Sequence, residues 1–217
     1  KIKYIGNLKF SQIENETNKL NYKTKKYILS KKTWCAASTH NTEEVLCATL
    51  HKKLKIKYKK LLTIIIPRHV ERTKEIISQI KKLDLKIHIH SSGKIIQNDT
   101  DIYLVDSYGK TKSFFKICKT VFLGGSYIRH GGQNPIEAAR YGCTILHGKN
   151  TWNFKEVYSL LNRYNVTNKI NNLNQMKNCL DNIFSKKHVS KNIKNKIDNL
   201  GDKILNTTLK EIESFII

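Results

Sequence analysis

The chain has 217 residues, 39% of them hydrophobic and 9% aromatic, which is enough to bury a core and excludes an intrinsically disordered protein. Its 40 Lys and Arg against 17 Asp and Glu give a formal net charge of +23, which leaves nucleic acid, an anionic membrane or an acidic substrate as partners. The lysines are scattered among asparagines and isoleucines, so we assign much of this charge to drift in base composition and most of the rest to contact with an anionic membrane.

Short apolar runs alternate along the chain with stretches of helical periodicity. The predicted strands are 34–38, 61–66, 85–90 (an exposed edge), 102–105, 121–123 and 143–147. Predicted helices are 39–58, one from Pro67 to about 82, 113–118 and 134–141, a short one within the polar segment 11–32, and three stretches after residue 153. Leu61–Ile66 is apolar on both faces, as in a buried parallel strand. The alternation predicts an α/β fold, a Rossmann-like parallel sheet flanked by helices, as one domain over 1–217.

Several conspicuous side chains are predicted to pack rather than to react. The five cysteines are odd in number and form no C-x-x-C pair, which indicates a reducing compartment and no disulfide framework, and Cys118 and Cys143 are predicted core residues. His88 and His90 share a strand face, but without a third ligand we expect no metal. The stripes at helical spacing near the C-terminus are predicted packing faces: Leu173, Met176, Leu180, Ile183, Phe184, and Ile193, Ile197, Leu200, Ile204.

Residues 121–153 carry the strongest local signal for a ligand. The apolar strand 121–123 runs into Gly124, Gly125 and Ser126, and a second glycine pair precedes Asn134-Pro135-Ile136-Glu137, which is typical of a helix start. Glycines between a strand and a helix N-terminus let backbone N–H groups approach an anion. This arrangement predicts a site for a phosphate-bearing ligand, although such turns also occur as packing features and the G-x-G-x-x-G fingerprint is absent.

Polar residues and glycines follow several of the predicted strands directly. Because ligands of parallel sheets bind beyond the carboxyl ends of the strands, we expect these residues to line one shared site. They are Ser38, Thr39, His40, Arg68, His69, Asp106, Ser107, Tyr108, Gly109, Gly124, Gly125 and Ser126.

The motif GGSYIRHGGQNPIEAARYG at 124–142, with NTWNF at 150–154, resembles the nucleotide-sugar-binding half of the Kdo transferases, which attach 3-deoxy-D-manno-octulosonic acid (Kdo) to lipid A precursor. Further matching segments fall in the same order: GNLKF at 6–10, WCAASTH at 34–40, PRHVER at 67–72 and DSYGK at 106–110. The chain departs from the family at Gln133, where histidine is usual, at Val70, where proline is usual, and at Lys110, where an acid is common. Because glutamine does not titrate, the change at Gln133 leaves any acid–base role there in doubt.

The resemblance implies the C-terminal half of an inverting, two-domain GT-B glycosyltransferase that binds the donor CMP-Kdo. Arg68 would meet its phosphate or carboxylate, with Pro67 and His69 beside it in the donor site. Glu137 would meet the ribose, and Tyr108 and Gly109 the base, while Gly124, Gly125 and Ser126 would offer N–H and hydroxyl donors. Ser38, Thr39 and His40 would line the rim. Two choices stay open: Asn134 caps the helix or contacts phosphate, and Glu137 closes a capping box, contacts ribose, or does both.

The resemblance also implies what lies outside this chain. The general base and most of the acceptor site would belong to an N-terminal domain, against which the helices of about 170–217 would pack. Because the chain begins at Lys1 and not at methionine, we expect it to be part of a longer protein, with no catalytic residue, metal or cofactor of its own. Its partners would be the donor, the lipid A precursor and an anionic membrane, at the cytoplasmic face of the bacterial inner membrane.

Two other functions remain open from the sequence. A UDP-sugar 2-epimerase-like enzyme also combines a glycine turn with a ribose-binding glutamate, but it would prefer UDP to CMP. A nucleic-acid-binding module would explain the charge, yet the chain has no RNP-like aromatic motif, zinc knuckle or basic helix, so we expect no nucleic acid partner.

Overall fold

A seven-stranded sheet forms the centre of the molecule in the computed structural model, which describes residues 2–11, 20–185 and 194–214. The strand order is β3-β4-β2-β1-β5-β6-β7, and every neighbouring pair is parallel. The strands are β1 (Lys32–Thr39), β2 (Leu61–Pro67), β3 (Ile87–Ile89), β4 (Ile102–Leu104), β5 (Thr120–Leu123), β6 (Thr144–His147) and β7 (Thr167–Lys169). The Rossmann-like α/β fold is confirmed. The sequence does not predict β7, because its Thr-Asn-Lys sequence is polar, and β3 is shorter than the predicted strand 85–90.

Helices cover both faces of this sheet. One face carries α2 (Glu43–Lys55), α3 (Thr73–Lys81) and α7 (Leu173–Ser185); the other carries α1 (Tyr22–Leu29), α4 (Thr111–Phe115), α5 (Ile136–Arg140), α6 (Lys155–Arg163) and α8 (Lys194–Glu213). Short 3₁₀ turns are η1 (Leu8–Ser11), η2 (Val70–Arg72), η3 (His90–Ser92) and η4 (Trp152–Phe154). Each face of the sheet has its own hydrophobic core, and alternate residues of a strand belong to one core or the other, because successive side chains point to opposite faces. In β1, Cys35 and Ala37 face α4 and α5, while Trp34 and Ala36 face α2.

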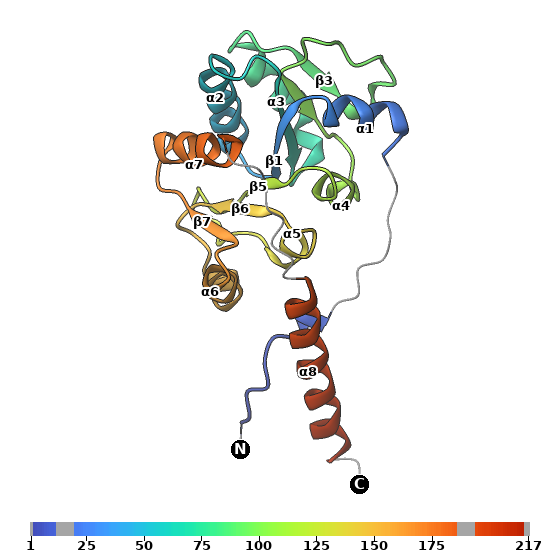
Figure 1. Cartoon of the computed structure of the whole chain (residues 1–217), viewed down its shortest axis with the longest axis vertical. Helices are drawn as coiled ribbons and strands as arrows, with labels where there is room; N and C mark the ends of the chain where they lie inside the picture. Colours follow the sequence, from blue (N-terminus) through green and yellow to red (C-terminus); the bar gives the residue numbers. More distant parts are fainter. Residues whose placement is uncertain (1, 12–19, 186–193, 215–217) are drawn as a thin grey trace.

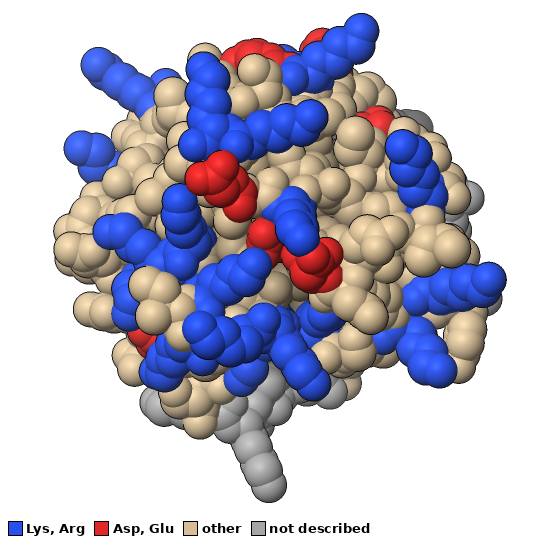
Figure 2. All heavy atoms as spheres, turned by 90° about the horizontal axis from the view of Figure 1, so that it is seen from above, with Lys and Arg blue, Asp and Glu red and all other residues tan. Residues whose placement is uncertain are grey.

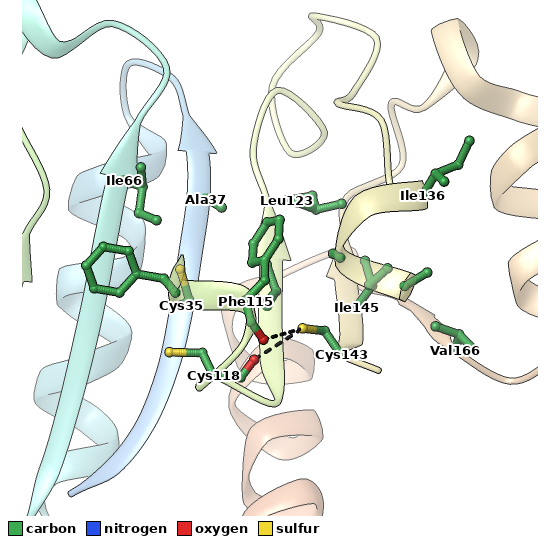
Figure 3. Close-up of a cluster of buried hydrophobic side chains, with 14 of the residues drawn as sticks. Cys35, Ala37, Ile66, Phe115, Cys118, Leu123, Ile136, Cys143, Ile145 and Val166 are labelled. Atoms are coloured by element: carbon green, nitrogen blue, oxygen red, sulfur yellow. Dashed lines mark hydrogen bonds between the residues drawn. The ribbon is translucent and has the colours of Figure 1, made fainter. Parts of the chain in front are cut away.

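The core on the α4 and α5 face contains three of the five cysteines. Cys35, Cys118 and Cys143 are buried there, and Cys143 Sγ donates to the carbonyl oxygens of Phe115 and Cys118 at 3.4 and 3.2 Å (Figure 3). All five cysteines are free thiols, and burial raises the pKa of Cys143 to about 12. The prediction that Cys118 and Cys143 are small core residues is therefore confirmed.

Helix α8 projects from the sheet, and residues 2–11 run beside it (Figure 1). Gly201 makes the contact possible, since a Cβ at this position would lie 2.1 Å from the carbonyl oxygen of Phe10. The predicted stripes pack as expected: Leu173, Met176, Leu180, Ile183 and Phe184 join one core, and Ile197, Leu200 and Ile204 join the other. Ile193 lies outside the described residues. Further along α8, Leu205, Leu209 and Ile212 are exposed.

The predicted edge histidines have a packing role. His88 stacks on the ring of Tyr103, with centroids 5.2 Å apart, and Nδ1 of His90 lies 2.7 Å from the Tyr103 hydroxyl. In the described part of the chain, no group of three or more His, Cys, Asp or Glu is arranged to hold a metal, and no helix is long and apolar enough to cross a bilayer.

Candidate functional site

The order of strands reverses between β1 and β5. From β1 the sheet continues through β2, β4 and β3 on one side, and from β5 through β6 and β7 on the other. Open α/β sheets bind ligands in the crevice outside the carboxyl ends of their strands at this switch point. Ser38 and Thr39 end β1 and His40 follows it, while Gly124–Ser126 follow β5, so both groups lie at the strand ends that border this point. The topology therefore places both predicted loops at the position where a ligand site is expected.

Close backbone contacts hold three strand ends together at this point. Ser38 adopts a left-handed conformation with φ 53°, where the pairing of β1 with β2 shifts register between Ala37 and Thr39. Such a conformation is uncommon for a residue with a Cβ and clusters at functional sites. The N–H of Arg68 then donates to the carbonyl oxygen of Thr39 at 2.9 Å. At Gly124 an added Cβ would lie 2.3 Å from the carbonyl oxygen of Ser38, so only glycine fits between the loops.

The glycine turn does not present its donors as predicted. The N–H of Gly124 donates to the Ala37 carbonyl oxygen at 2.9 Å and extends the sheet. The N–H of Gly125 donates to a carboxylate oxygen of Glu43 at 2.8 Å. The Ser126 side chain is fully buried, and its hydroxyl donates to the Leu123 carbonyl oxygen. These groups are already bonded within the protein, so the prediction that they donate to a ligand is corrected.

Histidine side chains from three loops meet beside the turn. The His40 ring lies 4.1 Å from that of His130 and 5.7 Å from that of His69, measured between centroids. The Gln133 side-chain nitrogen is 3.2 Å from Nε2 of His40. Burial, followed by the charges of His130, His69 and the neighbouring arginines, lowers the pKa of His40 to about 4. His40 is therefore neutral at physiological pH and can accept a hydrogen bond from the Gln133 amide.

The Arg68 guanidinium stands on this rim without a partner among the described residues. The residue is exposed and no carboxylate in that part of the chain pairs with it. The nearest arginine along the chain differs, because Arg72 pairs with Glu44 and Glu75, in both cases at 3.1 Å. An exposed, unpaired guanidinium at a strand end is available to bind a phosphate or carboxylate in a bidentate manner.

Glu71 links the loop that follows β4 to the same rim. One carboxylate oxygen of Glu71 accepts from the Tyr108 hydroxyl at 3.0 Å, and the other lies 3.2 Å from Nδ1 of His69. Tyr108 and Gly109 are exposed. The buried hydroxyl of Ser107 has no hydrogen-bond partner within the described residues, which is unusual for a buried polar atom.

Helix α5 carries the remaining predicted residues. Pro135 occupies the N-cap position, where the sequence predicts Asn134, and Asn134 stands one residue earlier, with its Oδ1 accepting from the Ile136 N–H at 3.1 Å. The helix has only five residues and therefore a weak dipole. Glu137 Oε1 lies 3.4 Å from Nζ of Lys112, which joins α5 to α4.

Contacts thus assemble the predicted residues in two groups. Ser38, Thr39, His40, Arg68, His69, Gly124 and Gly125 meet at the switch point, with Tyr108 joined through Glu71. Asn134 and Glu137 lie on α5, and no described contact links them directly to Arg68. The sequence alone does not mark Glu43, His130 or Lys112 as site residues. His130 lies inside the glycine motif, which is a usable signal, whereas Glu43 resembles any acid in a first helical turn.

The parallel sheet and its flanking helices have the fold of the C-terminal half of GT-B glycosyltransferases. No family model matches the chain. It is 31% identical over 163 residues to the 3-deoxy-D-manno-octulosonic acid transferase of Haemophilus influenzae, covering 74% of this chain and 38% of the relative. The match to the transferase of that name from Rickettsia prowazekii is 29% identical over 222 residues and covers 98% and 47%.

A solved structure from this family has the same fold as the chain. The C-terminal CMP-Kdo binding domain of WaaA from Acinetobacter baumannii superposes with a TM-score of 0.71 at 24% identity, covering 83% of this chain and 92% of that domain. The chain belongs with the Kdo transferases, as a relative of their C-terminal domain. It spans less than half the length of the two curated relatives above.

Proposed function

We propose that this chain binds CMP-Kdo as the donor-binding part of an inverting glycosyltransferase that transfers Kdo to lipid A precursor. The observation that carries the proposal is the exposed, unpaired guanidinium of Arg68 at the switch point, beside His69 and the His40–His130 pair. CMP-Kdo carries a phosphate and a carboxylate, and both are acceptors for such groups. The relatives supply the identity of the nucleotide and the sugar.

In the proposed reaction an acceptor hydroxyl attacks the anomeric carbon of Kdo, and CMP leaves. Arg68 would stabilise the negative charge that develops on the leaving phosphate, which is usually a large contribution to catalysis. The general base and the acceptor site would lie in the part of the protein beyond this chain. The surface around a cavity of about 890 Å³, which lies between residues 3–10, α6 and α8, would pack against that part. The exposed side chains of Leu205 and Leu209 would belong to the same interface.

Calorimetric titration of the chain with CMP, UDP and an oligonucleotide at two salt concentrations tests this proposal. We expect saturable binding of CMP that EDTA does not change, weaker binding of UDP, and no turnover by this chain alone. A preference for UDP would indicate the epimerase-like function. Oligonucleotide binding that weakens steeply with salt, without a response to CMP, would indicate a nucleic-acid module.

Glu137→Gln is expected to weaken CMP binding about tenfold, because the carboxylate would accept hydrogen bonds from two ribose hydroxyls. The same substitution should have little effect on the affinity for 2′,3′-dideoxy-CMP, which lacks those hydroxyls. Isothermal titration with both ligands measures the difference. Glu156→Gln is a suitable control, since Glu156 is exposed on α6 and bonds only Tyr4 among the described contacts. Equal losses for both ligands would argue against ribose recognition by Glu137.

We also propose that the chain works against an anionic membrane, at the cytoplasmic face of the inner membrane of a Gram-negative bacterium. Figure 2 shows Lys and Arg side chains spread over the upper face, with fewer acids among them. A hollow of about 620 Å³ between α1 and residues 93–96 exposes Tyr22 and Ile95 beside Lys23 and Lys94. Aromatic and aliphatic side chains next to lysines suit a lipid headgroup layer. Cosedimentation with phosphatidylglycerol vesicles, and not with neutral vesicles, is the expected result.

A further inference from the structure

Glu43 is the first residue of α2, and its carboxylate is enclosed between two loops of the candidate site. The residue is fully buried. Oε2 accepts from the N–H groups of His40 at 3.0 Å and Gly125 at 2.8 Å, and Oε1 accepts from the N–H of Tyr127 at 3.0 Å. One carboxylate therefore joins the turn that follows β1 to the turn that follows β5.

This arrangement occupies the backbone donors that phosphate-binding loops normally offer to a ligand. In such loops, N–H groups at a glycine turn point at the bound anion. Here the protein supplies the anion itself. A buried carboxylate is unfavourable unless it is hydrogen-bonded, and Glu43 meets that condition with three backbone N–H groups. The negative groups of a ligand must then be held by side chains on the rim.

We propose that Glu43 is a positioning residue for donor binding, an inference that rests on the function proposed above. Its carboxylate fixes His40, and hence the neighbours of His40, His130 and Gln133. The same turn carries Thr39, whose carbonyl oxygen accepts from the N–H of Arg68. Glu43 thereby fixes the position of the rim side chains without contacting the ligand.

The chain provides a matched control in the next residue. Glu44 is also fully buried, in the same turn of α2, but its carboxylate pairs with Arg72 at 3.1 Å and does not bond the glycine turn. Glu43→Gln keeps the shape of the side chain, yet its amide nitrogen cannot accept from an N–H group. Glu44→Gln removes an equally buried charge elsewhere. Glu43→Asp keeps the charge and shortens the side chain, and serves if the glutamine variant does not fold.

The experiment measures amide hydrogen exchange and CMP affinity in each variant. Glu43→Gln should speed the exchange of the Gly125 and Tyr127 amides at least about tenfold relative to β2 amides, and should weaken CMP binding about tenfold. Glu44→Gln should leave both quantities close to those of the unsubstituted chain, and Glu43→Asp should give intermediate values.

Different results overturn different claims. Unchanged exchange at Gly125 and Tyr127 in Glu43→Gln would show that the carboxylate does not hold the loops. Faster exchange with a loss of CMP affinity no larger than in Glu44→Gln would remove the positioning role and leave only a structural one. If the unsubstituted chain binds no CMP, the proposed function and the positioning role both fail, while the exchange data still decide whether Glu43 joins the two turns.

Discussion

Arg68→Ala is expected to weaken CMP binding by about 100-fold, the loss of a bidentate, charge-assisted contact with the phosphate. Arg68 is the exposed guanidinium on the rim without a carboxylate partner among the described residues, so its positive charge is available to a ligand. Because its N–H bonds the Thr39 carbonyl oxygen through the main chain, alanine keeps that contact. The effect should therefore be on affinity and not on folding, as measured by isothermal titration beside urea unfolding.

Two further variants show whether CMP binding depends on the bidentate geometry of the Arg68 guanidinium or only on its positive charge. Arg68→Lys should recover only part of the affinity, because an ammonium group cannot bind two phosphate oxygens in the same plane. Arg163→Ala removes an exposed arginine from α6 that lines the cavity beside α8 and not the rim, and it should leave CMP affinity unchanged. If Arg68→Ala and Arg163→Ala bind CMP equally well, the phosphate is held elsewhere and the proposed site is wrong.

The fold follows from patterns that the sequence displays directly. The β-branched, two-sided apolar run of β2 is typical of a central parallel strand, and residues of this strand are buried on both faces. Period-3.6 stripes predict α7 and the buried face of α8. Short elements are harder to predict, because β7 and η2 have three residues each and no distinctive composition. Their positions depend on neighbours that are distant in sequence.

The candidate site is predictable in position but not in chemistry. Residues at strand ends converge because the strands are parallel, and this needs only the order of elements. The partner of the glycine turn is a different matter. Nothing in the sequence distinguishes Glu43, which fills the N–H cradle, from Glu44, which binds an arginine instead. The left-handed conformation of Ser38 is equally unpredictable from the sequence, since serine has no marked preference for it. Only the three-dimensional contacts show these roles.

Gly124→Ala is expected to lower the free energy of unfolding by about 3 kcal/mol, because overpacking at a rigid contact is destabilising. The added Cβ would lie 2.3 Å from the carbonyl oxygen and 2.7 Å from the carbonyl carbon of Ser38, and 2.6 Å from Cα of Thr39. These are backbone atoms at the end of β1, so no side chain can rotate away to make room. The loops must separate, and CMP binding should fall with stability, as measured by urea unfolding and titration.

Gly93→Ala is the matched control for this substitution. Gly93 has φ 66° and no atom within 4 Å of an added Cβ, so alanine there introduces backbone strain without a clash. Such strain costs about 1 kcal/mol, and Gly93 lies away from the switch point, so CMP affinity should not change. If Gly124→Ala is no less stable than Gly93→Ala, the two turns are not in rigid contact. The close approach of the loops after β1 and β5, on which the geometry of the rim depends, would then be incorrect.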